Sequence, residues 1–325
     1  MRLLLISFLL LTAGFISAQK IPNLTKANTV TTFTYWNPGD KHTYHAVQRK
    51  SVYKDGKEKP QSELVTEYDI SFQVMNATDS SYEVEMVYSH YILPEAYSDM
   101  ELDLGKITEN IKVRYLTDEF GGFITILNKK EVVTILQQTL DVVSQKVSEK
   151  VAREKGKKSA EDMAAFELKM TGLKSVIASE ENVDAFFSDD ILILHGMYGQ
   201  ELVLGKPATF DVEYPALEQF VLKGSGTVTL NEINKAQDFA RFDVLQQPDP
   251  AEVKEFIQIL FGRLMPEGEE LKISDYKFSS KSRLNYIMSL STGWIQKVSA
   301  TTTTTVVSPR EEQKSVEKVT FEMKN

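Results

Sequence analysis

The longest run of alternating polar and apolar positions lies near the C-terminal end of the chain, at residues 276–290. Its even positions carry mostly apolar or hydroxyl-bearing side chains, and its odd positions carry mostly charged or polar ones. A period of two is typical of a β-strand with one buried and one solvated face. A strand of fifteen residues is about 50 Å long, whereas most strands have five or six residues. The pattern therefore predicts a long, curved sheet.

A short break at Ser291-Thr292-Gly293 predicts a hairpin, because the alternation resumes at Trp294. A three-residue loop that ends in glycine is typical of a hairpin with a bulge, since glycine adopts left-handed conformations readily. The threonine run 301–305 then belongs to the second strand of the hairpin and is expected to be partly exposed. The expected register pairs Leu290 with Trp294, Met288 with Gln296, Tyr286 with Val298 and Leu284 with Ala300.

Period-two patterns also predict strands in the rest of the chain. A last strand is expected around 319–323, and residues 19–39 are interpreted as a polar lead-in to the first strand. The other strands are expected at about 42–53, 64–74, 82–92, 110–117, 122–128, 208–214, 219–231 and 236–246.

Three segments instead show a helical period, at residues 129–154, 159–178 and 250–264. The third has the clearest start signal, with Asp249 as the N-cap residue and Pro250 in the first turn. We expect its apolar stripe to pack on the aromatic face of the C-terminal sheet. Residues 183–205 look loop-like because they contain three glycines, and a boundary near 180–205 is the one candidate linker.

The predicted fold class is α+β, mainly antiparallel, with long curved β-sheets covered by amphipathic helices. The predicted organisation is a signal peptide at 1–18, a lead-in at 19–39, a β-sheet with a helical hairpin at 40–182, and a second β-sheet with the helix 250–264 at 183–325. The two larger stretches form either two related halves or one continuous domain.

The first eighteen residues have the three regions of a secretory signal peptide: a basic start at Arg2, an apolar run, and a small residue, Ala18, at the cleavage position. The alternative is an uncleaved N-terminal anchor. No later stretch reaches the roughly eighteen apolar residues of a spanning helix. The chain has no cysteine, which excludes disulfides, thiol chemistry and a lipid-modified cysteine. We therefore expect an exported protein, periplasmic or extracellular, that is not a lipoprotein.

The formal net charge of −9 argues against nucleic acid and against an anionic membrane surface as partners. His42 and His45 lie three residues apart on a predicted strand, so their rings point to opposite faces and do not form half of a metal site. His90 is interpreted as a core or rim residue, and no nucleophile is recognisable for His195. No catalytic residue, metal ligand or cofactor is therefore predicted.

Two carboxylate pairs, Glu83/Glu85 and Asp189/Asp190, could supply acid–base chemistry, but solvated strand and loop positions are the better interpretation. Two glycine-containing segments resemble catalytic or phosphate-binding motifs only superficially. The segment 199–206 has the wrong spacing for a phosphate loop, and 224–226 lacks the flanking residues of a nucleophile elbow. Both are interpreted as turns.

Aromatic side chains on one face of the C-terminal sheet, together with the helix 250–264, form the candidate ligand-binding surface. The alternative is an ordinary core, since aromatic residues dominate cores as well as apolar cavities. The candidate residues are Tyr276, Phe278, Tyr286, Trp294, Phe256 and Phe261.

Long antiparallel strands, apolar helices and the strand–Thr292-Gly293-Trp294–strand hairpin resemble uncharacterised exported β-rich proteins of Gram-negative bacteria. The architecture also resembles the half-barrel of periplasmic lipoprotein carriers. This resemblance implies a non-enzymatic protein that binds an apolar small molecule, a lipid or an envelope protein. The alternative is a structural or assembly factor of the cell envelope without a small ligand. A hydrolase-type enzyme and a small outer-membrane barrel rank lower.

Overall fold

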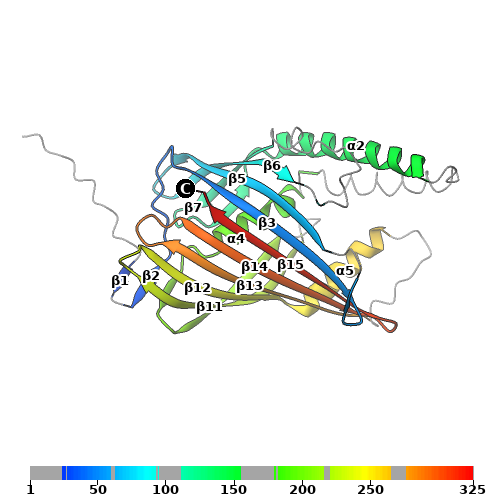
Figure 1. Cartoon of the computed structure of the whole chain (residues 1–325). Helices are drawn as coiled ribbons and strands as arrows, with labels where there is room; N and C mark the ends of the chain where they lie inside the picture. Colours follow the sequence, from blue (N-terminus) through cyan, green and yellow to red (C-terminus); the bar gives the residue numbers. More distant parts are fainter. Residues whose placement is uncertain are drawn as a thin grey trace, which may run out of the picture.

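The computed structural model describes residues 24–26, 28–59, 63–92, 94, 111–154, 179–180, 182–215, 220–264 and 276–324. Most strands belong to one large, open antiparallel sheet with the order β10-β11-β12-β13-β14-β15-β3-β5-β6-β7-β8, and β4 pairs with β3 (Figure 1). The mainly antiparallel class predicted from the sequence is thus confirmed. The strands are β3 (Lys41–Lys54), β4 (Lys57–Glu58), β5 (Leu64–Ala77), β6 (Ser81–Ile92), β7 (Lys112–Asp118), β8 (Phe123–Ile126), β10 (Pro207–Pro215), β11 (Val221–Asn234), β12 (Phe239–Pro248), β13 (Lys277–Ser289), β14 (Ile295–Val307) and β15 (Glu312–Met323).

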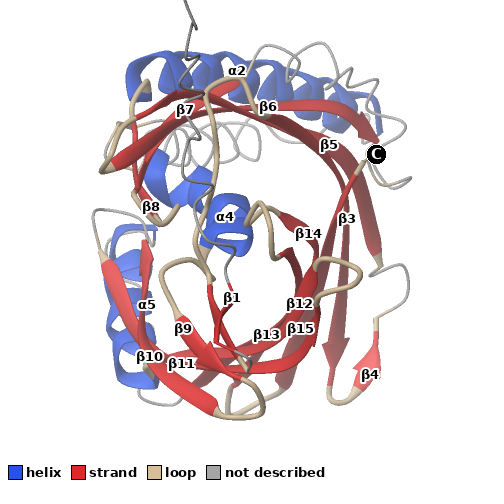
Figure 2. Cartoon of the chain, turned by 90° about the vertical axis from the view of Figure 1, so that its left-hand side faces the viewer, coloured by secondary structure: helices blue, strands red, loops and turns tan. Residues whose placement is uncertain are grey.

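The sheet curves so strongly that its edge strands β8 and β10 lie on the same side of the molecule (Figure 2). The last strand, β15, pairs with the early strand β3 from Met323↔Tyr44 to Gln313↔Lys54. This pairing places strands from residues 40–182 and strands from residues 183–325 in one continuous sheet.

The C-terminal hairpin has two of the expected pairs and a shifted third. Leu284 lies opposite Ala300 and Tyr286 lies opposite Val298, as predicted. Met288 lies opposite Ile295 rather than Gln296, because the register shifts at a bulge between Ile287 and Met288. The Leu290–Trp294 pair is also absent from the ladder, since β13 ends at Ser289 and β14 begins at Ile295.

The predicted helices at 129–154 and 250–264 are α2 (Lys129–Glu154) and α5 (Pro250–Leu264). The predicted helix at 159–178 lies outside the described residues, as do the signal peptide and the proposed cleavage position. No helix in the described ranges combines the length and apolar character that crossing a membrane requires.

The segment interpreted as a loop-like linker begins instead with a helix, α4 (Val183–His195). The curve of the sheet encloses this helix (Figure 2), and it contacts β8, β10 and β14. Val183, Ile191 and Leu194 are almost completely buried. The buried residues Val183, Phe187, Ile191 and Leu194 step by four, four and three, so the helical stripe is present in the sequence. The glycines that follow the helix favoured the loop-like interpretation instead.

The predicted turn at 224–226 is also wrong, because both glycines lie inside strand β11. The ring of Phe210 on β10 lies over Gly226, where an added Cβ would be 2.3 Å from the ring. A Cβ added at Gly224 would lie 2.5 Å from the backbone oxygen of Gln247 and 2.9 Å from the ring of Tyr214. The glycines therefore make room for aromatic rings of the neighbouring strand, which is a recognised use of glycine within sheets.

One end of the sheet is filled by residues that the sequence placed in the polar lead-in. Strands β1 (Leu24–Lys26), β2 (Thr29–Thr31) and β9 (Glu201–Val203) form a small second sheet there. Trp36 is buried and stacks on Trp294 of the hairpin, with ring centroids 4.4 Å apart. The hydroxyl of Tyr198 donates a hydrogen bond to the carbonyl of Gly293 at 2.9 Å. This end of the molecule is a packed core.

Candidate ligand-binding cavity

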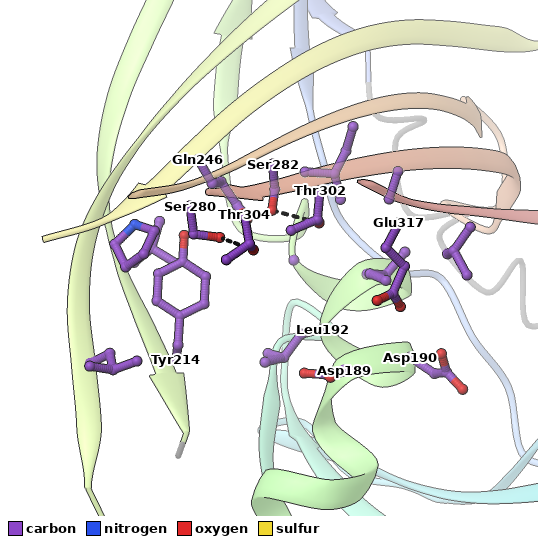
Figure 3. Close-up of a pocket in the computed structure, with 18 of the residues that line it drawn as sticks. Asp189, Asp190, Leu192, Tyr214, Gln246, Ser280, Ser282, Thr302, Thr304 and Glu317 are labelled. Atoms are coloured by element: carbon purple, nitrogen blue, oxygen red, sulfur yellow. Dashed lines mark hydrogen bonds between the residues drawn. The ribbon is translucent and has the colours of Figure 1, made fainter. Parts of the chain in front are cut away.

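A cavity of about 920 Å³ lies farther along the concave face of the sheet and is lined by residues of both α4 and α5; Figure 3 shows the side next to α4. It is lined by residues of the strands from β6 around to β10, together with residues of both helices. A cavity of this size falls in the range of small-molecule sites. Its walls differ in chemistry from one side to another.

One wall is apolar and comes largely from α5, β10 and β11. Val253, Phe256 and Ile257 of α5 line the cavity, since they share one face of the helix. The backbone N–H of Ala251 donates to the Asp249 carboxylate at 2.7 Å, which confirms the predicted N-cap. The other apolar residues of this wall include Phe210, Val212, Tyr214 and Leu222, and the exposed Asp211 and Glu213 of β10 also border the cavity.

The facing wall is a strip of hydroxyl and amide groups on the sheet. Beyond Leu284 and Ala300, the inward positions of β13 and β14 change from apolar to hydroxyl-bearing side chains. Across the two strands, the hydroxyl of Ser282 lies 2.8 Å from that of Thr302, and Ser280 lies 3.2 Å from Thr304 (Figure 3). The strip also includes Gln48, Thr66 and Gln246.

The third feature is a group of three carboxylates next to α4. Asp189 and Asp190 belong to the helix, and Glu317 extends toward them from β15 (Figure 3). The hydroxyls of Tyr88 and Tyr68 donate to Asp190, at 2.9 Å and 3.2 Å respectively. The described lining residues contain no lysine, arginine or histidine. The carboxylates therefore have only uncharged partners within the lining.

Burial raises the pKa of Asp190 to about 6, and the charges of Asp189 and Glu317 add to this effect. Hydrogen bonds from Tyr88 and Tyr68 act in the opposite direction, because they stabilise the ionised carboxylate. Burial also raises the pKa of Asp189, although its side chain is exposed to the cavity. These carboxylates make one end of the cavity electronegative, and keeping them ionised near neutral pH costs free energy.

The six residues predicted to bind a ligand do not share one surface. Phe256 lines the large cavity, and Tyr276 and Phe278 stack on each other outside its described lining. Tyr286 is buried beneath α4, where its hydroxyl donates to the carbonyl of Ile193 at 2.7 Å. Trp294 belongs to the packed core. The side chain of Phe261 lies outside the part of the chain that is described.

The predicted contact between α5 and the aromatic sheet face is divided between two helices. α5 contacts β13 and β11 at the cavity, whereas α4 contacts β14 and carries the acceptor for Tyr286. The apolar stripe of α5 alone could not reveal this division, because the segment that forms α4 was interpreted as loop-like.

Three of the four histidines contact aromatic or carboxylate side chains, whereas His90 is largely exposed, with Nδ1 3.0 Å from the Asp69 carboxylate. His195 is buried, with Nδ1 2.8 Å from the carbonyl of Gly121 and Nε2 2.9 Å from the Tyr115 hydroxyl. Burial lowers the pKa of His195 to about 4, so the ring is neutral near pH 7. His42 packs on Trp294, whereas His45 pairs with Asp69, consistent with the opposite faces expected from the sequence. Across the described ranges, no cluster of potential ligands is arranged to hold a metal ion.

Sequence reasoning missed the residues that give the cavity its polar character. Asp189/Asp190 was recognised as a carboxylate pair but interpreted as exposed loop. The usable signal was its position: the pair directly precedes the apolar run Ile191–Leu194. Charged residues beside such a run are expensive to bury, so they suggest a functional position.

Comparison with known proteins does not assign the chain to a family. No protein-family model matches it, and no curated protein matches it. A lipovitellin structure, solved to show lipid–protein interactions, is similar over 89% of this chain and 25% of that chain, with 9% sequence identity and a TM-score of 0.39. This chain thus spans about a quarter of that one. An outer membrane channel from Pseudomonas putida F1 is similar over 89% of this chain and 97% of that chain, with 7% identity and a TM-score of 0.13.

Proposed function

We propose that this protein is a non-enzymatic binder of a lipid-like small molecule, which it holds in the cavity between α4, α5 and the concave sheet face. The observation that carries the proposal is the cavity of about 920 Å³ with an apolar wall on one side and a hydroxyl strip on the other. An elongated ligand could place an alkyl chain against Phe256 and Leu222 and turn polar atoms toward Ser282 and Thr302. In this proposal α5 acts as the amphipathic cover of its part of the sheet.

We also propose that the protein is exported, with cleavage after Ala18, because the first eighteen residues match a secretory signal peptide. Its site of action would then be the periplasm or the outside of the cell. N-terminal mass spectrometry of the native protein should find Gln19 as the first residue. A chain that retains Met1 would contradict this part of the proposal.

The binding proposal can be tested with two adjacent serines of β13. Ser280 faces the cavity, whereas Ser279 is exposed on the opposite face of the same strand. Ser280→Phe should fill part of the cavity and weaken binding of the uncharged fluorophore N-phenyl-1-naphthylamine by about tenfold. Ser279→Phe adds the same ring outside the cavity and should leave the affinity unchanged.

Native mass spectrometry of the purified protein gives an independent measurement, because a bound lipid would appear as a mass addition. Absence of both fluorophore binding and a co-purified molecule would contradict the binding proposal. The alternative, a structural or assembly factor without a small ligand, would then be favoured. Equal binding by the two phenylalanine variants would show that the fluorophore binds elsewhere.

A further inference from the structure

The electronegative end of the cavity lies within a group of tyrosine rings. Tyr68 and Tyr91 stack with centroids 5.1 Å apart, and Tyr88 lies 5.9 Å from Tyr68 and 6.1 Å from Tyr91. All three rings line the cavity, and two of them donate to Asp190. Aromatic faces and carboxylates both attract cations, and their combination is the usual environment of a bound ammonium group.

The charge balance of the lining excludes one large class of amphiphile. Asp189, Asp190 and Glu317 adjoin the cavity at this end, the exposed Asp211 and Glu213 of β10 border it elsewhere, and no basic residue occurs in its described lining. A fatty acid or another anionic lipid would bring a further negative charge to this end without a cation to neutralise it. Such a ligand would be repelled, because charges interact strongly in poorly solvated sites.

Within the described lining, the carboxylates accept hydrogen bonds from neutral donors but form no ion pair with a basic side chain. Glu317 accepts a hydrogen bond from Gln48 at 2.5 Å, and Asp190 accepts only from tyrosine hydroxyls among its resolved contacts. The buried hydroxyl of Tyr214, elsewhere in the same lining, has no hydrogen-bond partner among the described residues. Neutral donors offset part of the cost of burying a carboxylate, whereas a bound cation would offset more of it.

From this geometry we infer that the ligand is a cationic amphiphile: its ammonium group lies among Asp190, Asp189, Glu317 and the tyrosine rings, and its alkyl chain follows the apolar wall toward α5. This inference rests on the proposed binding function and adds the chemical class of the ligand. Asp190 is the main specificity residue, because it is the carboxylate held by the two tyrosines.

The test compares three ligands with the same ten-carbon chain at pH 8: decyltrimethylammonium, decanol and decanoate. Each is used below its micelle concentration to displace N-phenyl-1-naphthylamine. The ammonium compound should displace the fluorophore at about tenfold lower concentration than decanol, and decanoate should be the weakest. Asp190→Asn should remove most of this advantage, measured as the ratio of the decanol and ammonium concentrations needed for displacement from the same variant.

A negatively charged protein can attract cations without a specific site, so the test needs a matched charge control. Glu317 and Glu322 lie on the same strand, but Glu322 is exposed and pairs with Lys297. Glu317→Gln should reduce the ammonium advantage, whereas Glu322→Gln, which removes the same charge elsewhere, should not. If Asp190→Asn fails to fold, Glu317→Gln still tests whether the carboxylates cause the ammonium advantage.

The outcomes separate the two proposals. If the fluorophore does not bind, the proposed function itself fails. If it binds but the three ligands compete equally, or decanoate competes best, the cavity remains a binding site and the inferred ligand class is wrong. An ammonium advantage that persists in both Asp190→Asn and Glu317→Gln would also overturn the inference.

Discussion

Gly293 closes the C-terminal hairpin against the packed end of the molecule, and replacing it should be unusually destabilising. Its φ of +76° lies in the left-handed region, where an L-residue costs roughly 1–2 kcal/mol. A Cβ at this position would lie 2.1 Å from the carbonyl oxygen of Phe33 and 3.0 Å from the Cα of Thr34. Both contacts are with backbone, so no side-chain rotation relieves them.

The neighbouring segment would have to move, and it is held by hydrogen bonds. The N–H of Tyr35 donates to the carbonyl of Thr292 at 3.1 Å, and the hydroxyl of Tyr198 donates to the carbonyl of Gly293 at 2.9 Å. Each such bond contributes about 1 kcal/mol, and overpacking typically costs a further 1–3 kcal/mol. Backbone strain, overpacking and the loss of one of these bonds together predict that Gly293→Ala lowers the free energy of unfolding by roughly 3–6 kcal/mol.

Gly56 provides a matched control. Its φ is +75°, nearly the same as that of Gly293, but no atom lies within 4 Å of a Cβ added there. Gly56→Ala should therefore show the backbone strain alone, roughly 1–2 kcal/mol. Urea denaturation followed by far-ultraviolet circular dichroism gives both values under one set of conditions. If the two variants differ by less than about 0.5 kcal/mol, the close approach of Gly293 to Phe33 is wrong.

Two further predictions concern the cavity. Folding raises the pKa of Asp190 from 3.8 to about 6, so the unfolded chain loses this proton at a lower pH than the folded protein does. The free energy of unfolding therefore falls as the pH rises from about 4 to about 6, and it stays lowered at higher pH. Asp190→Asn should accordingly raise the free energy of unfolding by about 1–3 kcal/mol at pH 7.5 relative to wild type, with no gain at pH 3.5. Urea titrations at the two pH values measure this difference. An equal effect at both would show that the ionisation of Asp190 is not its cause. Phe256→Ala should lower the free energy of unfolding by less than about 1.5 kcal/mol because the ring borders a cavity. Phe242→Ala in the fully buried core should lower it by about 3–5 kcal/mol. If thermal unfolding shows similar losses for the two variants, Phe256 is a core residue.

The sequence predicted most of the sheet because apolar and polar residues alternate along strands that have one buried face. It also predicted α5, whose start is marked by Asp249 and Pro250 and whose apolar residues share a stripe. The helix α4 was missed although its buried residues Val183, Phe187, Ile191 and Leu194 form a helical stripe, because the glycines that follow it favoured a loop-like interpretation. The bulge at Met288, by contrast, could not be predicted, since the extra residue depends on how the hairpin meets the packed end.

The cavity could not be predicted from the aromatic content of the sheet, because its position depends on where the inward side chains along each strand change from large to small. Along β13 the inward residues pass from Tyr286 and Leu284, which are buried, to Ser282 and Ser280, which line the cavity. All of these positions satisfy the same period of two, so alternation alone cannot separate core from cavity. The change from large to small inward side chains leaves space beside α4, and α5 provides the opposite wall. One continuous set of strands thus builds a packed core at one end and a cavity at the other.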